Sequence, residues 1–109
     1  MATDKQLLNR RIFARNFAEN NGSVLRTVNI LKTKYNKLKN LQFALNMEKN
    51  EIENSVNYLF EAGYLHLRNA ETKAQTSLAD ADFDAIEGKL TAKGIKLLAG
   101  AITDECVDI

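Results

Sequence analysis

The chain has no proline, no tryptophan, one cysteine and one histidine among its 109 residues. The single cysteine, Cys106, excludes an internal disulfide and is typical of a protein of the reducing cytoplasm. It lies among acidic side chains, which do not favour a reactive thiolate. The sequence therefore predicts a surface thiol without redox chemistry.

The sequence also lacks the long apolar run of a membrane span, and its first residues lack the apolar core of a signal peptide. Its apolar fraction of 45% and charged fraction of 27% are those of an ordinary globular domain. We therefore expect one cytoplasmic domain over residues 1–109, without a membrane partner. A chain of this length buries one modest core, so self-association can contribute to its stability.

Residues that metal and catalytic sites need are equally scarce. His66 has no second histidine or clustered cysteine, whereas a metal site needs several converging ligands. The aspartates of segment 80–84 alternate as calcium ligands can, but the glycine and glutamate of a calcium-binding hand are missing. No phosphate-binding glycine loop and no set of nucleophile and base is visible. We predict a protein that is not an enzyme and binds no cofactor or metal.

The net charge of +1 conceals two halves of opposite sign. Residues 1–49 carry ten Lys/Arg and three Asp/Glu, a net +7, whereas residues 50–109 carry five Lys/Arg and eleven Asp/Glu, a net −6. No acid occurs between Glu19 and Glu48. The basic half can bind phosphates, can face the acidic half of a second copy, or can simply be a solvated helix surface.

Residues 45–63 contain the clearest structural signal. Asn46 can adopt the left-handed conformation in a tight turn between two helices, and Gly63 is placed to end the second of them. The spacing i, i+4, i+7 and i+8 predicts one buried face of a helix over about 48–62, formed by Ile52, Val56, Leu59 and Phe60.

The preceding segment predicts two further helical regions. Thr3 and Gln6 form a capping box that opens a helix over 3–20, and Asn20-Asn21-Gly22 predicts its end. Its apolar stripe consists of Leu8, Ile12, Phe13 and Phe17.

Ser23 is a possible cap of the next helix. An apolar repeat from Val24 through Leu31 to Leu45 has no proline or glycine, so it allows one helix over 23–45. We favour a break near Asn36, which leaves a short helix over 38–45 in front of the turn.

The C-terminal part predicts a hairpin and a last helix. Tyr64, His66 and Arg68 alternate with leucines, as expected for a half-buried strand. Segment 70–84 is small, polar and acidic and predicts a loop, after which 85–90 returns as the antiparallel strand. Thr91 caps a helix over 91–103 with Ile95, Leu98 and Ile102 on one side, and an acidic tail over 104–109 frays.

Two motifs resemble the winged-helix superfamily of small prokaryotic regulators over about residues 38–99. The first ends in Glu61-Ala62-Gly63-Tyr64-Leu65, similar to the "LEEAGYL" that follows many recognition helices. The second, residues 90–98 (LTAKGIKLL), is similar to the "LTxKGxxLL" step from the wing into a C-terminal helix. The chain also resembles small winged-helix proteins of Mu-like phages and prophages.

This resemblance implies a mainly α fold with a small β-hairpin wing (α+β), an extra N-terminal helix and a C-terminal helix. It also implies a homodimeric transcription regulator that binds double-stranded DNA, with the second helix of the motif in the major groove and the wing on the backbone. The matching candidates for DNA contact are Lys37, Lys39, Lys49, Asn50, Asn54, Asn57, Arg68 and Lys73.

The sequence departs from the family in its acidic recognition helix. Glu48 stands where the family usually has Ser or Thr, and residues 48–62 carry one lysine against four glutamates. The alternative is therefore a protein-interaction module on the same scaffold that does not bind DNA, with an acidic or basic partner. Surplus apolar residues of the first helix, Leu7, Leu8, Phe13 and Phe17, are candidates for a dimer interface in either case.

Overall fold

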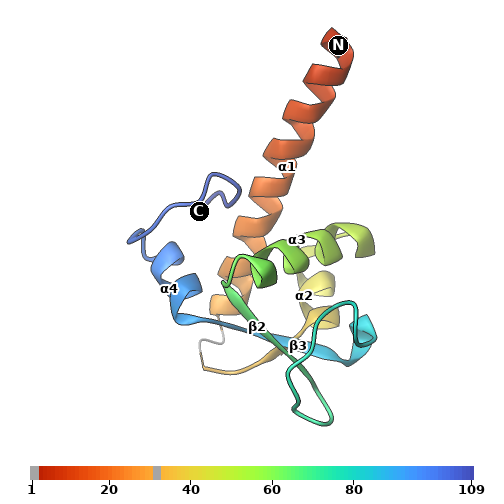
Figure 1. The fold of residues 1–109 in the computed structure, drawn as a ribbon, viewed down its shortest axis with the longest axis vertical. Coiled ribbons are helices and arrows are strands. Elements are labelled where there is room, and N and C mark those ends of the chain that lie inside the picture. Colours follow the sequence, from red (N-terminus) through yellow and green to blue (C-terminus); the bar gives the residue numbers. More distant parts are fainter. Residues whose placement is uncertain (1–2, 31–32) are drawn as a thin grey trace.

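The computed structural model describes residues 3–30 and 33–109, so Leu31 of the predicted apolar repeat and Lys32 of the basic segment lie outside the described residues. Within them the chain forms four α-helices and a small three-stranded antiparallel sheet, a mixed α+β layout compatible with a winged helix (Figure 1). None of the described helices has the length and apolarity needed to cross a bilayer. The elements are α1 (Asp4–Asn29), β1 (Asn36–Lys37), α2 (Leu38–Leu45), α3 (Lys49–Glu61), β2 (Leu65–Asn69), the 3-10 turn η1 (Phe83–Ala85), β3 (Ile86–Leu90) and α4 (Ala92–Leu98).

Helix α1 is longer than the sequence predicted. The capping box at Thr3 and Gln6 is confirmed, but the helix does not end at 20 and continues to Asn29. Gly22 is a buried residue inside this helix. No side chain fits there, because a Cβ would lie 1.8 Å from the backbone oxygen of Asp108. The glycine therefore permits close approach of the C-terminal tail instead of stopping the helix, and Ser23 is an interior residue instead of a cap.

The two predicted helices over 38–45 and about 48–62 are present, joined by a tight turn. The break between Asn29 and Leu38 separates α1 from the short α2, so 23–45 is not one helix. Asn46 has φ 52° and ψ 42°, the left-handed conformation expected of the turn. Helix α3 ends before Gly63, whose φ of +86° is accessible to glycine at little cost.

The sheet contains the predicted hairpin and one strand that the sequence did not suggest. Strand β3 lies in the centre, with β2 antiparallel on one side and the two-residue β1 on the other. Leu65 and Leu67 are buried, whereas His66 is exposed, so the predicted alternation is confirmed within β2. Tyr64, predicted on the side of His66, lies before the strand and is buried in the core. The buried faces of α1, α2, α3 and the sheet meet in one core.

Helix α4 begins as predicted but ends sooner. The Thr91 hydroxyl accepts a hydrogen bond from the Gly94 N–H at 3.0 Å, as expected of a cap. The helix ends at Leu98 instead of 103, and its most buried large side chain is Leu97, while Ile95 of the predicted inner face is 51% exposed. Gly94 allows close packing, because a Cβ there would lie 2.4 Å from the Tyr64 carbonyl oxygen.

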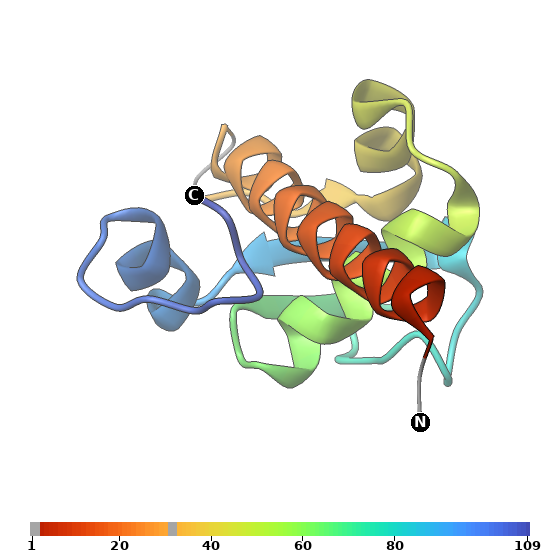
Figure 2. The same cartoon turned by 90° about the horizontal axis from the view of Figure 1, so that it is seen from above.

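The C-terminal tail is packed against the body, so the prediction that it frays is wrong. From α4 it passes back to α1 (Figure 2), where the Asp108 N–H donates to the Ala18 carbonyl at 2.9 Å. The side-chain amide of the buried Asn21 donates to the Cys106 carbonyl at 2.8 Å, and Val107 is buried in the core. Burial of an apolar side chain and satisfied backbone groups together hold this segment in place.

Candidate nucleic-acid interface

The solvent-facing side of α3 carries three of the predicted residues in one stripe. Asn50, Asn54 and Asn57 are all exposed and follow the i, i+4, i+7 spacing of a single helix face. The opposite face, with Ile52, Val56 and Leu59, is buried, and it fixes which side of the helix points outward. The structure therefore brings together the three carboxamides that the sequence proposed for contact with bases.

The charge of α3 and its cap is as acidic as the sequence indicates. The backbone N–H of Glu48 donates to the carboxylate of Glu51 at 3.0 Å, so the Glu51 side chain caps the N-terminus of α3. Lys49 is exposed with its Nζ 5.7 Å from the centre of the Phe83 ring. An anionic helix terminus stabilises the helix itself, but it repels phosphates near its first turn.

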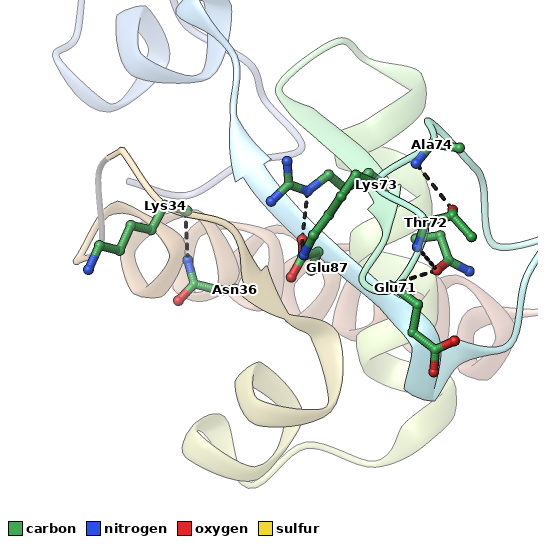
Figure 3. Close-up of polar contacts among 9 residues, drawn as sticks. Lys34, Asn36, Glu71, Thr72, Lys73, Ala74 and Glu87 are labelled. Atoms are coloured by element: carbon green, nitrogen blue, oxygen red, sulfur yellow. Dashed lines mark hydrogen bonds and ion pairs between the residues drawn. The ribbon is translucent and has the colours of Figure 1, made fainter.

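The predicted cations of the hairpin gather around a carboxylate that the sequence analysis missed. Arg68 Nε lies 2.6 Å and Lys73 Nζ 3.5 Å from Oε1 of Glu87, and Figure 3 shows Lys73 beside Glu87. The Arg68 guanidinium carbon lies 3.6 Å from the centre of the Tyr35 ring. Burial raises the pKa of Glu87, but its hydrogen bond from Arg68 and the charge of Lys73 outweigh this effect, so the pKa is lowered.

The strand register shows why these groups meet. Glu87 on the central strand pairs with Arg68 of β2 and with Lys37 of β1. Residues directly opposite one another in antiparallel strands project from the same side of the sheet. Lys89, two residues after Glu87, projects from that side as well, and its Nζ lies 5.9 Å from the centre of the Tyr35 ring.

We call Lys37, Arg68, Lys73, Lys89 and Glu87 the basic sheet face. It contains four cations and one carboxylate, a net +3. The face differs from the sequence prediction in two ways: Lys89 is an additional cation, and Arg68 is held by Glu87. The alternation of side chains along β3 puts Lys89 on the same side as Glu87, and the strand register puts Arg68 opposite Glu87. An assumed register would have predicted both contacts from the sequence.

Helix α2 presents the remaining predicted cation, Lys39, which is exposed. It borders a shallow surface depression of about 500 Å³ together with Phe43, whose side chain is 90% exposed. Phe43 therefore presents an apolar side chain beside the Lys39 cation on the surface of α2.

A second depression, which the sequence did not predict, lies between α1 and the start of α3. We call this space of about 460 Å³ the α1–α3 groove. It is lined by Phe13 and Phe17, by Glu48 and Glu51, and by four asparagines that include Asn50 and Asn54. The Phe13 and Phe17 rings are stacked with centroids 6.1 Å apart, and the Phe17 and Tyr58 rings form an edge-to-face pair with centroids 5.3 Å apart.

The two tyrosines with raised pKa, Tyr58 and Tyr64, lie where the tail meets the body. The hydroxyls of Tyr58 and Tyr64 each donate to Oδ2 of Asp104 at 2.7 Å, and the Cys106 N–H donates to its Oδ1 at 2.8 Å. Burial, followed by the bond to Asp104, raises the pKa of Tyr64 to about 12 and also raises the pKa of Tyr58. Partial burial opposes ionisation of Asp104, but these bonds outweigh it and lower its pKa.

The hydrogen bonds of Asp104 to Tyr58 and Tyr64 fix the tail against α3 and the start of the hairpin. Among residues 3–30 and 33–109, no three His, Cys, Asp or Glu side chains gather in a way that would hold a metal ion. No family model matches the chain, and no curated protein or solved structure is significantly similar to it.

Proposed function

We propose that this chain is a double-stranded DNA-binding protein of the winged-helix type, with regulation of transcription as its role. In this proposal α3 enters the major groove and the hairpin lies against the backbone. The observation that carries it is the exposed stripe of Asn50, Asn54 and Asn57 on a helix whose other face is buried. Asparagine can bind the N6 and N7 edge of adenine through two hydrogen bonds, so the stripe favours A·T-containing sites.

Phosphate contacts in this proposal come from outside α3. The basic sheet face has a net charge of +3 and Lys39 adds an exposed cation on α2. Such contacts position a protein on the duplex without specifying sequence. The carboxylates of α3 weaken non-specific binding, and we therefore expect a low affinity for random DNA.

The second candidate function is a protein-interaction module that does not bind DNA. It is favoured by the four glutamates of residues 48–62 and by Phe43, which is 90% exposed on α2. This candidate predicts no affinity for duplex DNA even at low salt.

The test is a pair of matched charge reversals measured by fluorescence anisotropy with labelled duplex DNA. Lys39→Glu changes an exposed lysine of α2, whereas Lys96→Glu changes an exposed lysine of α4 outside the proposed interface. We expect Lys39→Glu to weaken binding and to reduce the salt slope by about one, and Lys96→Glu to leave the slope unchanged. Equal effects of the two variants would contradict the proposed orientation.

Base contact is tested separately with Asn54→Ala. We expect this change to leave the salt slope unchanged and to reduce discrimination between A·T and G·C at one position by about 1–3 kcal/mol. A uniform loss across all sequences would assign Asn54 to the backbone instead of a base.

A further inference from the structure

The N-terminal half of α1 projects from the body (Figure 1), and only its last residues, Phe13 and Asn16, border the α1–α3 groove. We call residues 4–16 the arm; every one of them is exposed. At a rise of 1.5 Å per residue the arm is about 20 Å long. Its large apolar side chains are exposed by 43% at Leu7, 56% at Leu8, 49% at Ile12 and 63% at Phe13. A free helical segment of this length is marginal in water, and so much apolar surface indicates a partner.

The arm and the α1–α3 groove have complementary charge. The arm carries Lys5, Arg10, Arg11 and Arg15 against Asp4, a net +3, whereas the groove contributes the carboxylates of Glu48 and Glu51 and no cation. The groove also presents an apolar wall, the stacked Phe13 and Phe17 rings. A basic helix with apolar side chains therefore matches both parts of the groove.

The arm cannot occupy the groove of its own chain. It continues the same uninterrupted helix that forms one wall of that groove, and bending it back would break the helix. An arm from another molecule is free of this restriction.

We propose that a second copy of this chain binds here, with the arm of each copy lying in the α1–α3 groove of the other. Arg10 precedes Phe13 by three residues and Phe17 by seven, so it lies on the helix face that meets the partner. It pairs with Glu48 and Glu51 across the interface. The contact is reciprocal, as a two-fold dimer requires, and the two Phe13 rings meet near its axis.

An arm bound in the groove would reduce the surface of α3 that can contact DNA, although the dimer itself does not need DNA. Asn50 and Asn54 line the groove, so an arm lying there covers part of the stripe that we assign to base contact. Dimer formation and DNA binding would then compete for the first turns of α3.

Two charge-reversed variants test the proposal by sedimentation velocity. The arm variant carries Arg10→Glu and Arg11→Glu, and the groove variant carries Glu48→Lys and Glu51→Lys. Each variant alone places like charges in both contacts, so we expect its dimer dissociation constant to rise at least about tenfold. An equimolar mixture restores opposite charges in both contacts of the mixed dimer and should associate about as tightly as the native protein.

Several outcomes would overturn the proposal. Native protein that stays monomeric at hundreds of micromolar would exclude self-association, and a mixture no more associated than its components would exclude arm-to-groove pairing. If the arm and groove variants remain dimeric, but the added substitution Ile12→Asp dissociates them, the interface lies on another face of α1. Circular dichroism checks that each variant is folded, and Lys96→Glu is the control for a charge change outside both surfaces. Sedimentation of the protein alone gives all of these results without DNA, so the proposal fails or stands separately from the proposed function.

Discussion

Asp104 is predicted to hold the C-terminal tail in place through its two tyrosine partners. Asp104→Ala removes the acceptor of both phenol hydroxyls, each 2.7 Å from Oδ2. Hydrogen bonds to a charged group contribute about 1.5–3 kcal/mol each. Because Asp104 is only partly buried and water can replace it, we use the lower end of that range for both bonds. The expected loss in the free energy of unfolding is about 3 kcal/mol.

The assay is equilibrium unfolding in urea. With a slope of about 1–3 kcal/mol per molar urea, the midpoint of Asp104→Ala should fall by about 1–3 M. Asp104→Asn keeps a neutral acceptor and should lose about half as much. Glu105→Ala is the matched control, because this neighbouring carboxylate is exposed and makes none of the hydrogen bonds observed among the described residues; it should change stability by less than about 0.5 kcal/mol.

The stabilising effect of Asp104 depends on pH. The pKa of Asp104 is lowered in the folded state, so its stabilising effect is complete above the unfolded pKa of about 3.9 and is lost as pH falls through the folded value. The difference between the native protein and Asp104→Ala should therefore shrink below about pH 4. An effect of Asp104→Ala no larger than that of Glu105→Ala, or a difference that does not change with pH, would refute the reasoning.

Three further changes give predictions of their own. Ser55→Ala removes a buried hydroxyl that has no hydrogen-bond partner among the described residues, so it should raise the free energy of unfolding by about 1 kcal/mol in urea titrations. Gly22→Ala favours the helix locally, but its Cβ would meet the backbone of Asp108, so the tail should detach and the Cys106 thiol should react faster with a disulfide reagent. Glu87→Gln releases its two cationic partners, so the affinity for duplex DNA at low salt should rise and the salt slope should steepen by about one; unchanged anisotropy curves would remove the basic sheet face from the interface.

The parts of the fold that could be predicted depend on local chemistry. Asn46, Gly63 and Thr91 each act on their own few residues, and the apolar spacing of 52–60 is visible within one helix. These signals locate α2, α3, the hairpin and the start of α4. They do not reveal β1, because a strand of two residues has no periodicity.

The wrong predictions share a different cause, contact between residues far apart in the chain. Gly22 has the composition of a helix end, yet its role depends on Asp108, which the sequence places 86 residues later. The tail has the polar composition of a frayed end, but Asp104 binds Tyr58 and Tyr64, which lie 46 and 40 residues earlier in the chain. Only the folded arrangement shows these pairs.

The candidate interface was predictable in part for the same reason. The asparagine stripe follows from the helix period alone, whereas the basic sheet face requires the register that places Arg68 and Lys37 beside Glu87. The α1–α3 groove requires the crossing of two helices, and no sequence pattern indicates it.

The most direct test of the central claim is the salt dependence of native-protein binding to labelled duplex DNA, followed by anisotropy. If the exposed Lys39 and Lys49 and the basic sheet face, with its net charge of +3, neutralise four or five phosphates, the affinity falls with a log–log salt slope of about −4. Binding at low salt that weakens in this way is the result we predict. No binding at low salt would show that the glutamates of α3 prevent approach to the duplex, and it would contradict the proposed function.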